Sequence, residues 1–169
     1  MVKGALLALM LLSLPAVAGA QTPNPPAAIV EAAADCWEAT GATSVDLAKL
    51  AAKGWKPAEF KDKDGKALPT PLRFFGKADS SVMVMVLPSG DKPACSVTSR
   101  VGSVADYKPL MDGLQTRLKG LEPALKTGRG GTRGAAFVGG GKIALIEPTG
   151  TETEPAARFV VGMSASEKK

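Results

Sequence analysis

The sequence predicts an α+β fold: a single domain in which helices cover one face of an antiparallel sheet of about five to six strands. Helical and strand-like segments come in runs along the chain, an order typical of such a sheet. With 45% hydrophobic and 22% charged residues, the composition is that of a globular protein. The 169 residues, less an N-terminal export signal, have the length of one domain. We expect that domain to span residues 27–163.

The N-terminus has the features of a secretory signal peptide. Lys3 precedes an apolar run of about ten residues, and Ala18-Gly19-Ala20 supplies the small residues that a signal peptidase recognises. The run has about half the length that crosses a bilayer. We therefore expect residues 1–20 to be removed and residues 21–26 to form a flexible lead-in. The mature protein is expected to be periplasmic or secreted, with no transmembrane segment.

A first helix is predicted over residues 27–40. Its apolar side chains, including Ile29, Ala33 and Cys36, fall on one side of a helical wheel. Gly41 ends it. Three acidic residues fall on the opposite side, where a charged outer face is a commoner role than cation binding; these residues are Glu31, Asp35 and Glu38.

A second helix is predicted to open at the capping pair Thr43 and Asp46. Gly54 fits the position just past its end, where glycine adopts a left-handed backbone conformation. In the turn that follows, Trp55 is expected to pack back on Leu50.

Three strands are predicted next, over residues 72–77, 82–87 and 95–101. The middle one is a continuous apolar run, typical of a central strand. A third helix follows over residues 106–119. The remaining predictions are a short helical turn over 122–126, a glycine-rich loop over 127–134, strands over 135–138, 142–147 and 158–163, and a disordered tail over 164–169.

The predicted order is helix, helix, three strands, helix, three strands. The two halves have a similar order of elements, which raises the hypothesis of an internal duplication, although no repeat is visible residue by residue. The order is also similar to that of small exported α+β proteins such as the β-lactamase-inhibitor-protein fold. This similarity concerns the order of elements, so it implies nothing about function.

The two cysteines, Cys36 and Cys95, are expected to point into the core. Cys36 lies on the apolar side of the first helix, and Cys95 lies on the same side of its strand as Val97. An even cysteine count in an exported protein favours a disulfide. The alternatives are two separate buried thiols or a redox pair, which usually has Cys-x-x-Cys spacing. We predict a structural disulfide.

The residue inventory excludes several chemistries. With no histidine, the chain cannot use Ser-His-Asp or Cys-His activation or imidazole metal ligation. Two cysteines are too few for a four-cysteine zinc site or an iron–sulfur cluster. We predict no catalytic residues, no cofactor and no metal site.

The formal net charge of +5 comes from basic residues scattered along the chain, a pattern typical of a solvated surface. The alternative is attraction to an anionic envelope component. We expect no nucleic-acid binding, because aromatic residues do not interleave with the basic ones. The weak anion-binding candidates are Arg129, Arg133 and Lys142. They lie in a glycine-rich stretch that matches no phosphate-loop motif, so we prefer a loop followed by an edge strand there.

Two short motifs match elements of the serine β-lactamase and penicillin-binding families. Residues 89–92 read S-x-x-K and residues 126–128 read K-T-G. We interpret both as chance matches. Ser89 is expected in a hairpin turn and Lys126 at the end of a helix, whereas those families place the nucleophile at the start of a helix and K-T-G on a strand. Met83 and Met85, on one side of a predicted strand, are expected to pack in the core.

These observations predict an exported, non-catalytic protein that binds a protein or an envelope component. Two alternatives stay open. A histidine-free hydrolase would need two converging carboxylates, or Ser89 within hydrogen-bond reach of a lysine. A small-ligand carrier would need an apolar pocket of roughly a few hundred Å³ between helix and sheet. The sequence makes no prediction of oligomeric state.

Overall fold

The structure is a computed structural model that describes residues 22–59, 61, 63–67, 70–87, 92–118, 122–127 and 133–164. For residues 122–127 and 133 it describes the backbone alone. The predicted signal peptide and the last five residues of the predicted tail lie outside the described residues. Within the described ranges, no helix is long and apolar enough to cross a membrane.

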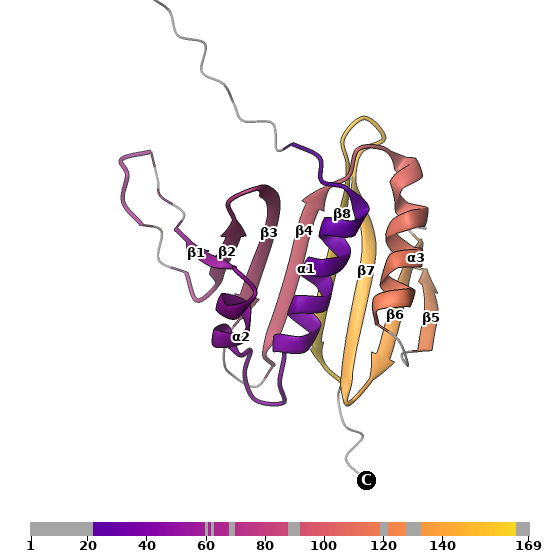
Figure 1. Cartoon of the computed structure of the whole chain (residues 1–169), viewed down its shortest axis with the longest axis horizontal. Helices are drawn as coiled ribbons and strands as arrows, with labels where there is room; N and C mark the ends of the chain where they lie inside the picture. The colour runs from indigo at the N-terminus through magenta and orange to yellow at the C-terminus, as the bar shows by residue number, and fades with distance from the viewer. Residues whose placement is uncertain are drawn as a thin grey trace, which may run out of the picture.

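The described residues form one eight-stranded antiparallel sheet with the helices on one of its faces (Figure 1). The strand order is β1-β2-β3-β4-β8-β7-β6-β5. This arrangement confirms the predicted α+β class with a single antiparallel sheet. The elements are α1 (Pro26–Ala39), α2 (Leu47–Ala52), β1 (Lys56–Ala58), β2 (Arg73–Lys77), β3 (Ser80–Leu87), β4 (Ala94–Arg100), the 3-10 turn η1 (Val104–Asp106), α3 (Tyr107–Arg117), β5 (Glu122–Thr127), β6 (Arg133–Gly139), β7 (Lys142–Gly150) and β8 (Pro155–Met163).

Each half of the sheet is a run of four antiparallel strands preceded by helix. Strands β1–β4 follow α1 and α2, and strands β5–β8 follow α3. The halves join where β4 pairs with β8, from Ala94 opposite Gly162 to Arg100 opposite Ala156. The two halves therefore share their order of strands, while an internal duplication stays a prediction.

The sheet has more strands than the five to six predicted. Strand β1 was missed because it has only three residues, Lys56-Pro57-Ala58, and proline is a poor strand signal. The helical turn predicted over residues 122–126 is wrong. These residues form β5, which pairs antiparallel with β6. A six-residue segment carries little periodicity, so its pairing partner decides its structure.

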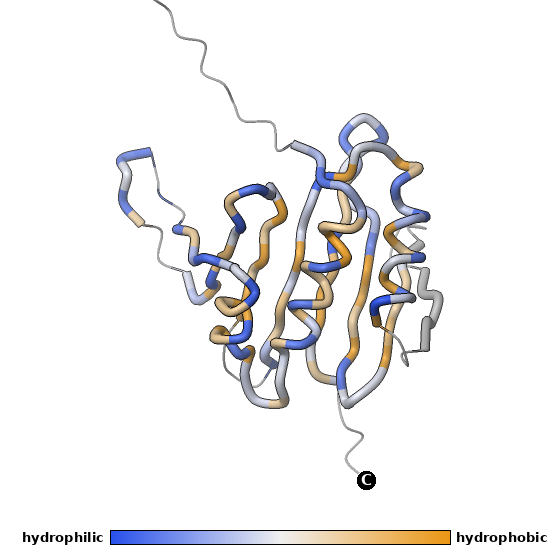
Figure 2. Tube along the Cα trace, viewed as in Figure 1, coloured by the Kyte–Doolittle hydropathy of each residue, from blue (hydrophilic) through white to orange (hydrophobic). Residues whose placement is uncertain are grey.

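The core lies between the helices and the covered face of the sheet. In β3 the buried residues alternate, and Val82, Val84 and Val86 point towards the helices. In β4 the same face carries Cys95 and Val97, which are completely buried. Figure 2 shows hydrophobic residues along β3. Strands β7 and β8 extend this layer with Ala144, Ile146, Phe159 and Val161.

Helix α2 ends in the predicted glycine turn. Gly54 has a φ of 87°, in the left-handed region that glycine adopts without strain. Its amide donates to the carbonyl of Ala51 at 2.9 Å, and the amide of Trp55 donates to the carbonyl of Leu50 at 3.1 Å. This is the bonding pattern of the predicted helix stop. The start of α2 differs, because Asp46 alone is the N-cap and accepts bonds from the amides of residues 48 and 49.

The predicted lead-in contains a buried side chain. Asn24 is 7% exposed, and its side-chain amide donates to Ser81 Oγ at 2.6 Å and to Ser99 Oγ at 2.9 Å. Its backbone amide donates to the carbonyl of Arg100 at 3.0 Å. These bonds attach the chain ahead of α1 to the ends of β3 and β4. Helix α1 then begins at Pro26, a residue favoured in the first helical turn.

Candidate functional site

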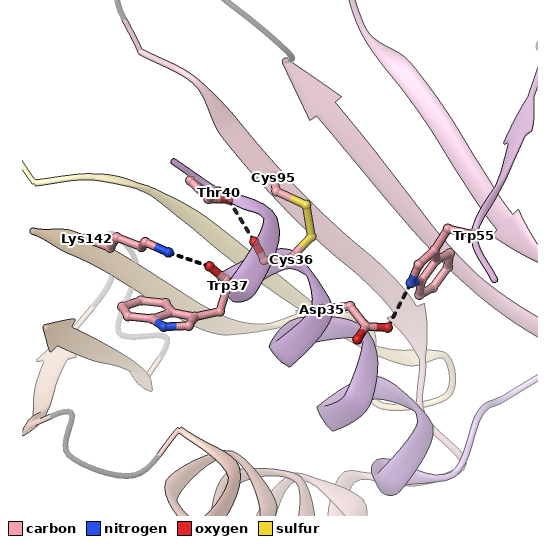
Figure 3. Close-up of a disulfide and its surroundings, with 7 residues drawn as sticks. All are labelled: Asp35, Cys36, Trp37, Thr40, Trp55, Cys95 and Lys142. Atoms are coloured by element: carbon pink, nitrogen blue, oxygen red, sulfur yellow. Dashed lines mark hydrogen bonds between the residues drawn. A yellow bond between two sulfur atoms is a disulfide. The ribbon is translucent and has the colours of Figure 1, made fainter. Parts of the chain in front are cut away.

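The structure forms the predicted disulfide between Cys36 and Cys95 (Figure 3). Their Cα atoms are 5.5 Å apart, and both side chains are fully buried. The bond ties α1 to β4 in the middle of the sheet. Near the same end of α1, Thr40 Oγ1 donates to the carbonyl of Cys36 at 2.8 Å. A buried, fully packed disulfide has a structural role and is compatible with an extracytoplasmic protein.

Asp35 does not belong to a solvated outer face as its position on the helical wheel predicts. It is 4% exposed, and Trp55 Nε1 donates to its Oδ2 at 2.9 Å (Figure 3). Lys77 Nζ donates to the same oxygen at 3.3 Å and lies 4.5 Å from the centre of the Trp55 ring. The three side chains form a buried polar contact between α1, the end of α2 and β2.

The other two acidic residues of α1 are paired with cations from neighbouring helices. Glu31 lies 3.4 Å from Arg117 Nε, and Glu38 lies 3.2 Å from Arg117 and 3.1 Å from Lys53. The hydrogen bond from Lys53 is the main reason that the pKa of Glu38 is lowered. Within the described part of the chain, no group of three or more metal-ligating side chains comes together. The acidic residues therefore link helices.

Lys142 is the one anion-binding candidate whose side chain is described. Its Nζ donates to the carbonyl of Trp37 at 2.7 Å and lies 5.2 Å from the centre of the Trp37 ring (Figure 3). Burial is the main reason that its pKa is lowered. Lys142 thus satisfies a carbonyl near the end of α1. Arg129 lies outside the described residues, and Arg133 is described by its backbone alone, at the start of β6.

The S-x-x-K and K-T-G motifs are not brought together by the described strands. Lys126 and Thr127 lie on strand β5, so the helix end predicted for them is wrong. Ser89 lies outside the described residues, between β3 and β4. Three strands, β8, β7 and β6, separate β4 from β5 in the sheet.

The structure also gives no support to paired catalytic carboxylates. Glu31 and Asp112 border one surface groove between α1 and α3. Each already has a cation, because Glu31 pairs with Arg117 at 3.4 Å and Asp112 pairs with Lys108 at 2.6 Å. Each carboxylate is therefore engaged in an ion pair of its own rather than with the other carboxylate.

The face of the sheet that the helices leave uncovered carries rows of neighbouring side chains, which together we call the open face. The register of the strands defines these rows. The upper row is Met83, Thr98, Arg158 and Glu147. The middle row is Phe74, Met85, Ser96, Val160, Leu145 and Ala136. The lower row is Leu87, Ala94, Gly162, Ile143 and Val138.

From β2 to β6 the middle and lower rows of the open face contain no charged residue, and on β5 the register continues the lower row to Glu122, opposite Val138. The charged pair of the upper row is satisfied internally, because Arg158 donates to Glu147 at 2.6 Å. Val138 is 44% exposed, and Ser96 is 6% exposed with a hydroxyl that has no hydrogen-bond partner. Ala136 is buried, yet it is not among the residues of the core cluster. The open face is therefore a second apolar layer.

Met83 and Met85 belong to this open face, and the prediction that they pack in the core is wrong. Both are partly exposed, while the valines between them are buried under the helices. The sequence carried a signal of this surface in the continuous apolar run of β3. That run alone predicts a central strand. Combined with the prediction that helices cover one face, it would have identified an uncovered apolar surface.

Two pockets lie on the helical side of the sheet. The larger, about 580 Å³, lies between α2 and strands β1 and β2, and both Glu59 and Arg73 line it. The smaller, about 300 Å³, lies between α3 and strands β6 and β7, and no charged side chain lines it. The second meets the requirement stated for a small-ligand carrier, an apolar pocket between helix and sheet.

Fold and site together define a class: a disulfide-bonded α+β protein with helices on one face of its sheet and an apolar surface on the other. Comparison of the chain with protein-family models, with curated proteins and with solved structures finds no match. The similarity to the β-lactamase-inhibitor-protein fold therefore stays a likeness in the order of elements.

Proposed function

We propose that this chain is an exported binding protein whose open face docks on another protein. The observation that carries the proposal is the uncharged, largely apolar surface of the middle and lower rows. An antiparallel sheet with one solvated face ordinarily alternates apolar inward and polar outward residues. Strand β3 departs from that rule, because apolar residues occupy both of its sides from Val82 to Leu87.

The size of the open face suits an interaction surface. From β2 to β6 the rows extend about 24 Å across the strands and about 13 Å along them at usual strand spacings. The three rows together cover about 300 Å², and the uncharged middle and lower rows make up about half of that area. The partner would cover side chains that are now partly exposed, including Met85 and Leu145.

The chemistry of the open face favours a protein over an anionic polymer. Two cations on this side of the sheet are already paired, Arg158 with Glu147 in the upper row and Arg100, two residues beyond Thr98, with Glu154. The centre is formed by Met83 and Met85, whose flexible thioether side chains adapt to irregular apolar surfaces. The expected partner therefore presents a flat apolar patch, with polar groups only where it meets the Glu147–Arg158 pair.

Site-specific photo-cross-linking tests this proposal. A photoreactive amino acid replaces Met85 in the mature chain, and an exposed position on the opposite side of the molecule, Gln115 on α3, provides the matched control. We expect one protein to be captured from the extracytoplasmic fraction at Met85 and not at Gln115. Capture of a second copy of this chain would identify the open face as a homodimer interface.

The purified partner then allows a quantitative test. Met85→Glu places a charge in the middle row and should weaken binding at least tenfold, since a carboxylate buried without a partner costs several kcal/mol. Gln115→Glu should leave the affinity unchanged. Equal binding by the two variants, or equal capture at both positions, would rule out the open face as the docking surface.

A further inference from the structure

The pocket beneath α3 exists because of how that helix is held. Gly113 brings α3 close to α1: a Cβ on this glycine would lie 2.8 Å from a methyl of Val30. At the start of α3, Tyr107 Oη donates to the carbonyl of Ala156 at 2.8 Å and lies 3.3 Å from the carbonyl of Thr149. Helix α3 thus packs against α1 and is fixed at the end of the sheet. Its buried residues Leu110 and Leu114 belong to the core, and a space remains beside Tyr107 and Met111.

The strands opposite α3 do not fill the remaining space. Strand β6 presents the small residue Ala135 there, beside the backbone of Gly134. The pocket of about 300 Å³ is the result. Its lining is Tyr107, Leu110 and Met111 from α3, Ala135 from β6, and Ile146 and Pro148 from β7.

We propose that this pocket binds a compact, uncharged, apolar molecule carrying at most one hydrogen-bond donor. None of the lining residues has a charged side chain, so an ionic group would enter without a counter-charge, at a cost of several kcal/mol. An apolar cavity of roughly 150 Å³ stays dry and accepts benzene. About twice that volume accommodates a molecule with two to three rings.

Tyr107 sets the polar requirement of the ligand. Its hydroxyl hydrogen is used in the bond to Ala156 O, so its oxygen can only accept a further hydrogen bond. Burial raises the pKa of Tyr107, which keeps the hydroxyl neutral. A ligand acceptor would therefore find no free donor on the tyrosine, and the ligand needs at most one N–H or O–H group of its own.

The pocket has a route of access. Tyr107 and Pro148 also line a second, shallower depression of about 530 Å³, which includes the exposed Val104. The shared walls place the two spaces side by side at the same end of α3. The depression is therefore the neighbouring surface from which a ligand would approach the pocket. This site lies on the covered side of the sheet, so it is independent of the open face.

Two fluorescent probes with the same ring system test the proposal on the mature, disulfide-bonded chain. N-phenyl-1-naphthylamine is uncharged and has one N–H group, and 8-anilino-1-naphthalenesulfonate adds a sulfonate to the same skeleton. We expect saturable one-to-one binding of the uncharged probe and at least tenfold weaker binding of the sulfonate. Equal or tighter binding of the sulfonate would indicate the basic surface and would overturn the proposal.

Variants locate the bound probe. Ala135→Leu fills the pocket from the sheet and Met111→Phe fills it from the helix, so each should weaken binding of the uncharged probe at least tenfold. Gln115→Ala, at an exposed position of α3 outside the pocket lining, is the matched control and should bind as the parent chain does. If Ala135→Leu fails to fold by circular dichroism, Met111→Phe decides the matter. Absence of binding to the parent chain, or unchanged binding to folded filling variants, would refute the site.

Discussion

The two longer helices lie over the same face of one sheet but are attached to it differently. Helix α1 is bonded to β4 through Cys36 and Cys95 and contacts β3, β4 and β8 directly. Helix α3 packs against α1 and is tied to the sheet by Tyr107 at one end. Buried side chains of both helices belong to one core, and a pocket also lies between α3 and strands β6 and β7. The covalent attachment and this pocket therefore belong to different halves of the sheet.

Among the changes that test this difference between the two helices, removal of the disulfide should have the largest effect on stability. The bond closes a loop with a sequence separation of 59. The chain-entropy model gives about 4 kcal/mol for a loop of that size, as an upper value. Cys36→Ala with Cys95→Ala should lower the free energy of unfolding by most of that amount in urea titrations. Reduction of the parent chain should produce a similar loss, and a loss below about 1 kcal/mol in both experiments would show that α1 is held by packing alone.

Asp35→Ala should have the next largest effect. The substitution leaves the buried Trp55 Nε1 without its acceptor and Lys77 without its nearest carboxylate. A buried donor left unpaired costs about 1–3 kcal/mol, and more where a charge is involved. Asp35→Asn separates the two causes, because an amide oxygen can still accept from Trp55. Tryptophan fluorescence during urea unfolding should show Asn to be the milder change, and equal losses would assign the effect to charge.

The close approach of α3 to α1 predicts an intermediate effect on stability for a substitution at Gly113. Gly113→Ala would overpack against Val30, at a cost of about 1–3 kcal/mol, offset by about 1 kcal/mol of helix propensity. The paired change Val30→Ala should remove the clash. Thermal unfolding of the two single variants and the double variant forms a cycle. If the stability changes of the two single variants add up to that of the double variant, this contact does not position α3.

Tyr107→Phe tests the other attachment of α3. The change removes the hydroxyl that donates to Ala156 O and leaves the ring in place. The loss of one such bond costs about 1 kcal/mol. Hydrogen exchange should show faster opening of the amides of α3, with those of α1 unchanged. Equal acceleration in both helices would mean that the two halves unfold as one unit.

Local signals in the sequence predicted the parts of the fold that local chemistry determines. Gly54 and Trp55 close α2 as predicted, because the turn needs only a glycine and an apolar residue in the right order. Cys36 and Cys95 were paired by their apolar positions and the expected export. Helix α1 and strand β4 were located for the same reason, since the apolar pattern within each segment reports which side is buried.

The remaining features depend on contacts between distant segments. Asp35 lies on the polar side of a wheel, but Trp55, twenty residues later, brings a donor that allows it to be buried. Residues 122–126 became a strand because β6 was available to pair with them. The open face was missed because an apolar run such as that of β3 does not reveal how many faces of its sheet are covered. The pocket under α3 depends on the tertiary positions of Gly113, Gly134 and Tyr107.

The smallest expected effect concerns pH and the ion pairs that join α1 to its neighbours. Glu38 has a lowered pKa, mainly through the hydrogen bond from Lys53. Its contribution to stability is therefore present above the unfolded pKa of about 4.3 and is lost as the pH falls through the lower folded value. Because the Glu38 side chain is 42% exposed, solvent screening limits its contribution to stability to about 0.2–1 kcal/mol. Glu38→Gln should reduce the loss of stability between about pH 5 and about pH 3 by that amount, as measured by urea unfolding at each pH. Glu152→Gln, at an exposed glutamate with no ion pair among the described residues, should leave that loss unchanged. If both variants lost the same stability between these pH values, the ion pairs of Glu38 with Arg117 and Lys53 would make no net contribution to the stability of the protein.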